Sequence, residues 1–367
     1  MEERFVCDRC LEEFNISEQY AFDESVYCPD CIDEVSVVCA HCGERIPTNG
    51  NAGTDETPLC SVCASDYYCF CEGCGQLIRN EDAYYLDDDE DTPYCYECYD
   101  IRKERTAIHP YGYKPEPIFY GEGNRYFGIE LEIDDAGKDS DNARHLLNVA
   151  NAENPHVYIK SDSSLNDGME IVTHPMSMDY HQYDMPWKDI LDCARDMGYK
   201  SHDAQTCGLH IHVSRRCFGQ SYEEQESHIA RILYFVEHHW LELLKFSRRT
   251  EAQMKRWASR YGYKNTPQEI LNTAKAGSIG RYACVNIQNY DTIEFRMFRG
   301  TLKINTLIAT LQLVNEICNV AISYSEEELS HLSWFDFVER IDHPELIAYL
   351  KQRRLYINDP VACEEDL

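Results

Sequence analysis

Basic residues are scarce in this chain. Of its 367 residues, 34 are lysine or arginine and 65 are aspartate or glutamate, so the formal net charge is −31 at pH 7. The shortage is greatest in residues 1–105, where 7 basic residues stand against 26 acidic ones. Because phosphate groups and anionic lipids bind to positive surfaces, this balance argues against nucleic acid or a membrane as a general partner.

Three familiar sequence features are also missing. We find no apolar run long enough to span a membrane, and residues 1–7 lack the basic and apolar regions of a signal peptide. These two absences predict a soluble, cytoplasmic protein. A Gly-x-x-x-x-Gly-Lys-Ser/Thr loop is absent as well, which argues against the P-loop way of binding ATP.

Cysteine, by contrast, is abundant near the N-terminus. Thirteen of the nineteen cysteines fall in residues 1–100, and twelve of these form Cys-x-x-Cys pairs that start a new set of four every 32 residues. The sets are Cys7, Cys10, Cys28 and Cys31; Cys39, Cys42, Cys60 and Cys63; and Cys71, Cys74, Cys95 and Cys98. This spacing predicts about three structural Zn2+ ions in three modules of zinc-ribbon, LIM-like or treble-clef type, at residues 1–35, 36–67 and 68–100. Pairing within each repeat is the simplest arrangement, and sharing of ligands between neighbouring repeats is the alternative.

These zinc modules carry too much negative charge to attract phosphate. Residues 1–105 have a net charge of −19, and each zinc ion with four thiolates adds about −2. We therefore expect the modules to bind a protein partner or to serve a structural role, and not to bind nucleic acid.

The composition changes after residue 100. Residues 101–120 contain three prolines and a basic stretch, which is typical of a linker. A catalytic domain is expected at 121–330, followed by a helical extension and acidic tail at 331–367. Apolar periodicity predicts helices near 141–151, 186–197, 222–246 and 305–323. His238 and His239 lie on the third of these, where adjacent residues diverge by about 100° and are poor joint ligands.

Three stretches in this domain alternate apolar and polar residues with the period of a β-strand. They are Tyr126–Asp134 with Glu130 and Glu132, Cys207–Ser214 with His210, His212 and Ser214, and Thr292–Thr301 with Glu294 and Arg296. Alternate residues of a strand face the same side, so each stretch has one apolar and one polar face. Side by side, the polar faces would line one concave sheet with ligands suited to divalent cations and phosphate. Structural histidines and solvated strand faces are the plainer interpretation of each stretch alone.

Taken in order, these motifs resemble the glutamine synthetase-like carboxylate–amine ligases, and most closely their amidoligase branch. The pattern is Gly-x-Glu-x-Glu, then Gly-x-His-x-His-x-Ser, then Glu-x-Arg. Between the first two lies Asp-Ser-Ser-Leu, followed by Gly-Met-Glu-Ile-Val, and Arg281 precedes the last, in an expected strand from 281 to 287. The resemblance covers about residues 121–325. It implies an α+β, glutamine synthetase-like domain in which helices flank an antiparallel sheet.

The resemblance also implies an activity and a set of site residues. The activity is ATP-dependent formation of an amide from a carboxylate and an amine through an acyl phosphate, with two or more Mg2+ or Mn2+ ions. One cation is assigned to Glu130, His210 and Glu294, and a second to Glu132 and Glu170 with Asp162. His212 and Ser214 would lie near the nucleotide, and Arg281, Arg296 and Arg299 would face the γ-phosphate or the substrate carboxylate. Asp162 departs from the family pattern, since Asp-Ser-Ser stands where Asp-Gly-Ser is commoner.

Two other functions fit parts of the sequence. One is a metal-dependent hydrolase that uses the same carboxylates and histidines, and the other is a zinc-module adaptor with an inactive ligase-like domain. The clustered arginines and the basic segment 247–280 favour the ligase, because phosphoryl transfer requires more positive charge. The amine acceptor could be a small molecule, a peptide or a protein.

Overall fold

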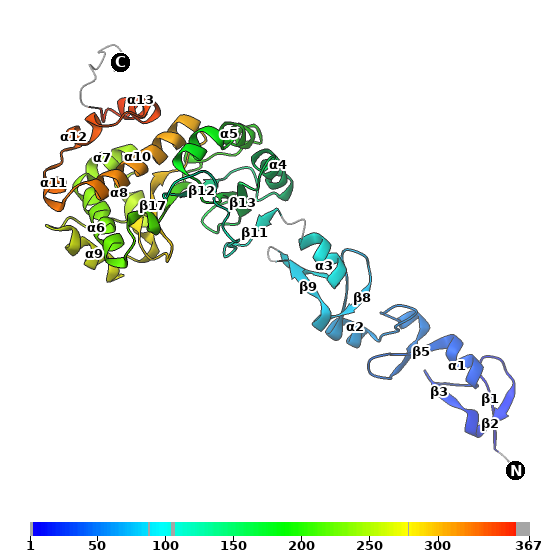
Figure 1. Ribbon diagram of the computed structural model, residues 1–367. Helices are drawn as coiled ribbons and strands as arrows, with labels where there is room; N and C mark the ends of the chain where they lie inside the picture. Colours follow the sequence, from blue (N-terminus) through cyan, green and yellow to red (C-terminus); the bar gives the residue numbers. More distant parts are fainter. Residues whose placement is uncertain (1–2, 87–88, 104–106, 278, 357–367) are drawn as a thin grey trace. The chain divides into compact units, whose positions relative to one another are not determined.

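The computed structural model describes residues 3–86, 89–103, 107–277 and 279–356. The chain divides into two units, Met1–Thr106 and Ala107–Leu367 (Figure 1). Both helices and largely antiparallel strands are present, which confirms the predicted α+β class. The acidic tail predicted at the C-terminus lies outside the described residues.

The N-terminal unit repeats one small pattern three times. In the first repeat, β1 (Arg4–Val6) pairs with β2 (Glu13–Asn15), β3 (Tyr20–Phe22) pairs with β4 (Ser25–Tyr27), and α1 (Pro29–Val35) follows. In the second, β5 (Ser36–Val38) pairs with β6 (Arg45–Pro47), and α2 (Ser61–Tyr67) follows. In the third, β7 (Tyr68–Phe70) pairs with β8 (Leu77–Arg79), β9 (Tyr84–Leu86) pairs with β10 (Asp89–Tyr94), and α3 (Tyr96–Lys103) follows. Each repeat also has one short 3₁₀ helix, η1 (Ile16–Glu18), η2 (Thr48–Gly50) or η3 (Asn80–Asp82). Every repeat thus ends on a helix, which a ribbon of strands alone would lack.

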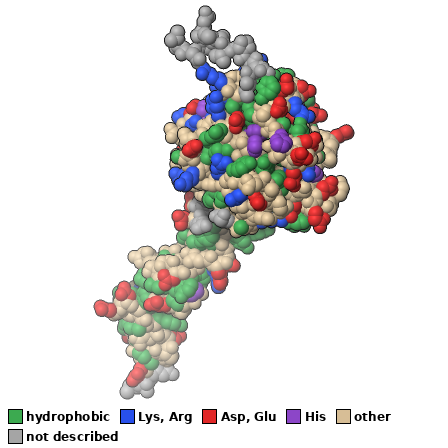
Figure 2. Space-filling model, turned by 90° about the vertical axis from the view of Figure 1, so that its left-hand side faces the viewer, with side chains coloured by type: hydrophobic (Ala, Val, Ile, Leu, Met, Phe, Trp, Pro, Cys, Tyr) green, Lys and Arg blue, Asp and Glu red, His purple; other side chains and the backbone are tan. Residues whose placement is uncertain are grey.

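Little apolar surface is buried within these repeats. The clusters that form consist of the cysteines with a few neighbours, such as Phe5 in the first repeat and Ile46 and Leu59 in the second. Other large side chains stay open to solvent: Tyr67, Phe70 and Tyr96 are 50%, 48% and 60% exposed. Figure 2 shows such hydrophobic side chains on the surface of the N-terminal unit. Cores this small bury too little apolar surface to stabilise a folded repeat. Bound metal would have to contribute the remaining folding free energy.

A seven-stranded sheet forms the centre of the C-terminal unit. Its order is β11-β13-β14-β12-β15-β17-β16, and all neighbours are antiparallel except β11 and β13. The strands are β11 (Ile108–His109), β12 (Phe127–Ile133), β13 (Val157–Lys160), β14 (Met169–Thr173), β15 (Gly208–Ser214), β16 (Val285–Asn286) and β17 (Thr292–Arg299). The three motif strands β12, β15 and β17 are direct neighbours in the middle of this sheet.

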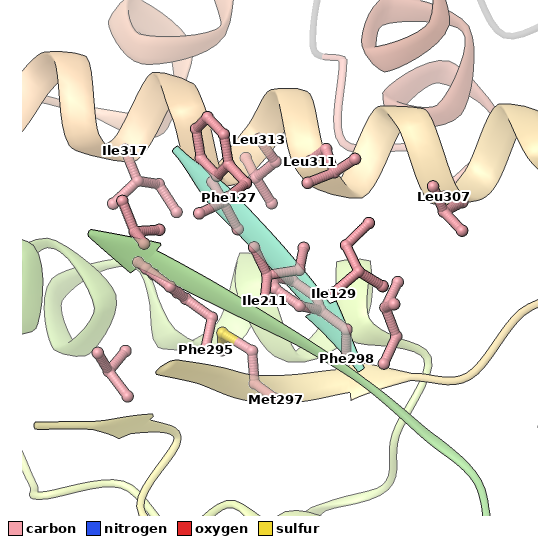
Figure 3. Packing of buried hydrophobic residues seen from close by; sticks show 14 of the residues in the cluster. Phe127, Ile129, Ile211, Phe295, Met297, Phe298, Leu307, Leu311, Leu313 and Ile317 are labelled. Atoms are coloured by element: carbon pink, nitrogen blue, oxygen red, sulfur yellow. The ribbon is translucent and has the colours of Figure 1, made fainter. Parts of the chain in front are cut away.

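Helix α10 (Ile304–Ser323) covers the apolar face of the motif strands. Figure 3 shows its Leu307, Leu311, Leu313 and Ile317 packed over Phe127, Ile129, Ile211 and Phe295. The predicted helix near 305–323 is therefore confirmed. The expectation that no run could span a membrane is wrong for this segment, because α10 is long and apolar enough by length and composition. Its most apolar window is 72% buried inside the unit, which is the environment of a core helix.

The other helices of this unit are mostly short. They are α4 (Ser140–Ala150), α5 (Trp187–Asp196), α6 (Tyr222–His238), α7 (Trp240–Ser247), α8 (Glu251–Trp257), α9 (Pro267–Lys275), α11 (Glu326–His331), α12 (Trp334–Glu339) and α13 (Pro344–Gln352). Between them lie the π-helix η4 (Tyr180–Asp184) and the 3₁₀ helices η5 (His202–Ala204), η6 (Arg215–Phe218) and η7 (Gly280–Tyr282).

Two sequence predictions are corrected by this arrangement. The helix expected over 222–246 breaks at His239, whose backbone is not helical and whose buried ring packs on Phe235 and Trp334. Tertiary packing of one imidazole thus interrupts a continuous apolar pattern. The strand expected over 281–287 shrinks to β16, and Arg281 lies on the preceding turn η7.

Candidate zinc sites and candidate active site

Each of the three predicted cysteine sets comes together in space. Within a set, the four sulfur atoms lie within 4.8 Å of one another. The sulfur atoms of Cys10 and Cys28 are 4.0 Å apart, those of Cys42 and Cys60 are 3.9 Å apart, and those of Cys74 and Cys95 are 3.8 Å apart. Four sulfurs at about 2.3 Å from a tetrahedral Zn2+ would be about 3.8 Å apart, so the sets fit zinc. Ligands pair within each repeat, as in the simpler of the two predicted arrangements.

The local backbone favours one thiolate in every set. Burial alone would raise the pKa of Cys7, but backbone N–H groups of Cys10 and Cys28 point at its sulfur and lower that pKa to about 6. The same geometry lowers the pKa of Cys39 and of Cys71 to about 6. In contrast, burial and the neighbouring sulfurs raise the pKa of Cys31 to about 12. All four thiolates can therefore exist together only with a cation between them.

The register of the central strands gathers the predicted carboxylates and histidines on one face of the sheet. Glu130 lies opposite His210, His212 lies opposite Glu294, and Glu132 lies opposite Glu170. Since neighbouring strands are only about 4.8 Å apart, these side chains must contact one another. The face is largely shielded from solvent, with Glu132, Glu170, His210 and Glu294 each no more than 5% exposed.

Two groups in this cluster have the spacing of cation sites. The first is Glu130, His210 and Glu294, and the second is Glu132, Glu170 and His210; in each, the ligand atoms lie within 4.8 Å of one another. Nδ1 of His210 is 3.4 Å from Glu130 and 3.7 Å from Glu294, while Nε2 is 3.9 Å from Glu132. Hard oxygen ligands with one imidazole suit Mg2+ or Mn2+. Glu170 Oε2 and His212 Nε2 are buried without a hydrogen bond of good geometry, although Lys160 lies 3.1 Å from the first and Glu130 lies 3.4 Å from the second. A cation or its bound water would satisfy such atoms.

The cluster holds more negative than positive charge. Burial, reinforced by the negative charge of Glu130, raises the pKa of Glu170 well above its usual value. Burial also raises the pKa of Glu132. Glu130 and Glu294 behave in the opposite way, because His212 and His210 outweigh the effect of burial and hold their pKa values low. A buried carboxylate whose pKa is raised by burial and by neighbouring negative charge marks a place where one more cation would be stabilised.

Lys160 is a site residue that the sequence did not reveal. Its ammonium is 3.1 Å from Glu170 and 3.8 Å from Glu130, and the side chain is buried. Burial lowers the pKa of Lys160, but these two carboxylates raise it by more, so the residue stays charged. The sequence indicates Lys160 only through the alternation of strand β13, whose last residue it is. The structure places Lys160 directly opposite Glu170.

A β-bulge on β17 places Arg296 beside the first cation group. Between the pairs Ile211–Phe295 and Leu209–Phe298, the strand β17 has one residue more than β15. Arg296 lies in this bulge and donates to Glu294, whose other oxygen accepts a hydrogen bond of 2.9 Å from Asn286. Bulges re-aim side chains next to functional sites, and strict alternation could not predict this one.

The remaining predicted site residues lie farther out. Arg281 is exposed on η7 and donates to the hydroxyls of Tyr111 and Tyr282, each at 3.0 Å. Asp162 belongs to neither cation group among the described residues, and its carboxylate accepts from the backbone of Ser164. Ser214 ends β15 opposite Thr292. Arg299 donates to the carbonyl of His202, beyond the bulge.

Two further residues lie at the site: Tyr111, which the sequence did not indicate, and Arg249, which was expected only as part of the basic segment 247–280. Tyr111 joins Arg281 to Lys160, since the Lys160 ammonium lies 5.5 Å from the Tyr111 ring centre. Arg249, from the turn after α7, donates to the carbonyl of Phe298 at 3.1 Å and is close enough to Glu132 to influence its pKa. Both come from loops, where no periodicity marks a functional position.

The sequence matches the family described as "Putative amidoligase enzyme" over residues 131–318, just over half of the chain. The protein therefore belongs to this amidoligase family. Most of the cluster, from Glu132 to Arg296, lies inside the matched range, and Glu130 lies one residue before it. No curated protein matches the chain.

Among solved structures, the chain is similar to a bifunctional glutathione synthetase from Pasteurella multocida. The two share 14% sequence identity with a TM-score of 0.35, over 63% of this chain and 46% of that protein. The chain thus spans less than half of that protein's length. A similarity this distant assigns no fold, so the glutamine synthetase-like architecture stays a prediction.

Proposed function

We propose that this protein is an ATP-dependent carboxylate–amine ligase of glutamine synthetase-like architecture. The observation that carries the proposal is the buried cluster of four glutamates and two histidines, with Arg296 against it, in a chain of the amidoligase family. Carboxylates in this number are suited to holding divalent cations on the β- and γ-phosphates of ATP.

In the proposed reaction, an oxygen of the substrate carboxylate attacks the γ-phosphorus, and the bond from that phosphorus to the β,γ-bridging oxygen breaks. The products of this step are an acyl phosphate and ADP. The amine then attacks the acyl carbon, the carbon–oxygen bond to phosphate breaks, and inorganic phosphate leaves as the amine loses a proton. Bound Mg2+ or Mn2+ would neutralise the charge that develops on the transferring group.

The protein's own residues have distinct roles in this proposal. Glu130, His210 and Glu294 hold one cation, and Glu132 and Glu170 hold the other, with Lys160 as a fixed positive charge between the two groups. Arg296 is the cation placed to meet the transferring phosphoryl oxygens. His212 and Ser214 contact the nucleotide, and Arg281 and Arg299 approach from the rim. Asp162 completes the second group only if its loop moves.

The zinc modules complete the proposal. We assign modules 1–35, 36–67 and 68–100 to structural zinc and to binding of a protein partner, and 121–330 to catalysis in the cytoplasm. Residues 101–120 are assigned to a linker, part of which, β11 (Ile108–His109), joins the edge of the sheet. The net charge of −19 over residues 1–105 supports a protein rather than a nucleic acid as partner.

Chromatography of the nucleotide products tests the chemistry. With a productive acid and amine, we expect ADP and phosphate to form only when Mg2+ or Mn2+ is present. AMP and pyrophosphate would instead mean attack at the α-phosphorus, and amide cleavage without ATP use would favour the hydrolase. Glu294→Gln should abolish turnover, whereas the matched control Glu339→Gln, on an exposed position of α12, should not. Full turnover by Glu294→Gln would remove the basis for this site.

A further inference from the structure

A second feature of the C-terminal unit is a hollow of about 450 Å³ with a strongly basic lining. Five cationic side chains line it together with two leucines and a threonine, and no acidic side chain does. The five cations, called here the basic hollow, are Lys245, Arg248, Arg249, Arg299 and Arg353. In a chain with nearly twice as many acidic as basic residues, five cations without one carboxylate are unusual.

Within the described residues, no cation of the basic hollow forms a salt bridge with a carboxylate, although the negative charge of Glu132 reaches Arg249. Arg248 donates to the carbonyls of Arg299 and Gly300 at 3.3 and 3.1 Å, and Arg353 donates to the carbonyl of Lys245 at 2.8 Å. Each guanidinium has five N–H groups, so these bonds fix its position and leave donors for a ligand. The carboxylate of Asp203, whose charge reaches Arg248, pairs instead with His202.

Two further observations show that the arrangement of these cations opposes folding. Burial lowers the pKa of Arg249 to about 10, because the negative charge of Glu132 only partly opposes it and the positive charges of Arg296 and Arg299 reinforce it. Arg248 has a φ of 61°, the left-handed region that glycine adopts freely and other residues avoid. Strain and uncompensated charge of this kind concentrate at ligand sites.

The basic hollow adjoins the carboxylate cluster through Arg249. A Cβ atom placed on Gly208 would be 2.8 Å from Nη2 of Arg249, 2.8 Å from Nε2 of His210 and 3.4 Å from Glu132. The carboxylate cluster and the basic hollow therefore adjoin each other at Gly208. One ligand can have a carboxylate at the cations and a second anionic group in the basic hollow.

We propose that the basic hollow binds a second carboxylate of the acid substrate. The substrate class is then a di- or tricarboxylic acid, either free or as the end of an acidic peptide. This inference rests on the proposed ligase function, which places the first carboxylate of that acid at the cation groups. Arginine forks match a carboxylate geometrically. Backbone carbonyls hold all four arginines of the basic hollow in place before the ligand arrives.

Calorimetric titration of the full-length protein with citrate and with triglutamate tests the proposal, with a monocarboxylate, acetate, as the reference. We expect saturable binding of citrate or triglutamate but not of acetate. Lys245→Gln and Arg248→Gly should each weaken it about tenfold or more, because each removes a charge-assisted hydrogen bond. Arg248→Gly also suits the left-handed backbone, so that variant should fold. The matched control is Arg256→Gln, an exposed cation of the same basic segment that does not line the hollow.

Three outcomes would overturn the proposal. Equal weakening by Arg256→Gln would mean general charge attraction. Displacement of citrate and triglutamate by tripolyphosphate and by a non-hydrolysable ATP analogue would mean that the hollow holds nucleotide phosphates. Unchanged binding in both hollow variants would mean another site. The ligase function is tested separately: if triglutamate binding responds as expected but no acid yields ADP, only the ligase proposal fails. If monocarboxylates yield ADP at the full rate, only the inference about the hollow fails.

Discussion

Replacement of Gly208 by alanine would test whether the cluster around His210 and Arg249 binds a cation, because it adds a single methyl group between these two side chains. The added Cβ would lie 2.8 Å from both Arg249 Nη2 and His210 Nε2. Carbon–nitrogen contacts settle near 3.5–4.0 Å, so these side chains must each retreat by about 1 Å or the strand must move. Both neighbours are the ends of flexible side chains, so overpacking should cost only about 1 kcal/mol of the free energy of unfolding.

The effect on cation binding should be much larger than the effect on stability. Metal–ligand distances tolerate changes of about 0.2 Å, so a displaced His210 is lost as a ligand. We expect Mn2+ affinity, measured by calorimetry or electron paramagnetic resonance, to fall at least ~10-fold, the size found when ligand orientation is disturbed. Zinc content should not change, because the cysteine sets lie in the other unit.

Gly128→Ala is the matched control for this experiment. Gly128 is on the neighbouring strand β12, and its added Cβ would make only an ordinary contact of 3.6 Å with His212. Gly128→Ala should retain Mn2+ affinity and unfold at a similar urea concentration. If Gly208→Ala binds Mn2+ like the wild type, or if both variants lose affinity equally, then the crowding over Gly208 does not define the cation site.

Three other predictions follow from the structure. Elemental analysis of protein purified without added metal should find three zinc ions per chain, and one zinc or none with disulfides would contradict the cysteine sets. His210→Ala should abolish metal-dependent ADP formation, whereas His238→Ala on helix α6 should leave it unchanged; equal loss in two folded variants would displace the site from β15. Stability should fall as pH drops from about 6.5 toward 4, because burial lowers the pKa of His181 to about 4 and only the unfolded state takes up a proton in that window. His181→Gln should remove about 3 kcal/mol of this loss in urea titrations at pH 7 and pH 4, and parallel curves for both proteins would refute it.

Local spacing allowed the cysteine sets and the motif strands to be predicted. Cys7 and Cys10 are held in one turn of backbone, so their joint role is readable from a few residues. Alternation likewise predicts that His210 and His212 share a face. The order of strands depends on long-range packing, yet three complementary polar faces were enough to suggest that β12, β15 and β17 are neighbours.

Features that depend on tertiary structure could not be predicted. The bulge at Arg296 adds one residue to a strand without any change in the apolar pattern, so Phe298 reaches the core where alternation would place a polar residue. Lys160 looks like a solvated strand end until Glu170 pairs with it. Arg249 and Tyr111 come from loops, whose paths the sequence does not specify.

The position of His210 in both cation groups has a consequence for the ions themselves. A neutral imidazole has one nitrogen with a free lone pair, while the other carries a hydrogen and can only donate. Nδ1 faces Glu130 and Glu294, and Nε2 faces Glu132, so the tautomer of one ring decides which group gains a nitrogen ligand. That group then accommodates Mn2+ more readily, and the group left with carboxylates alone suits Mg2+. With cations bound as proposed, the two groups would therefore be unequal at any moment, and the transfer of a single proton from one nitrogen to the other would exchange their preferences.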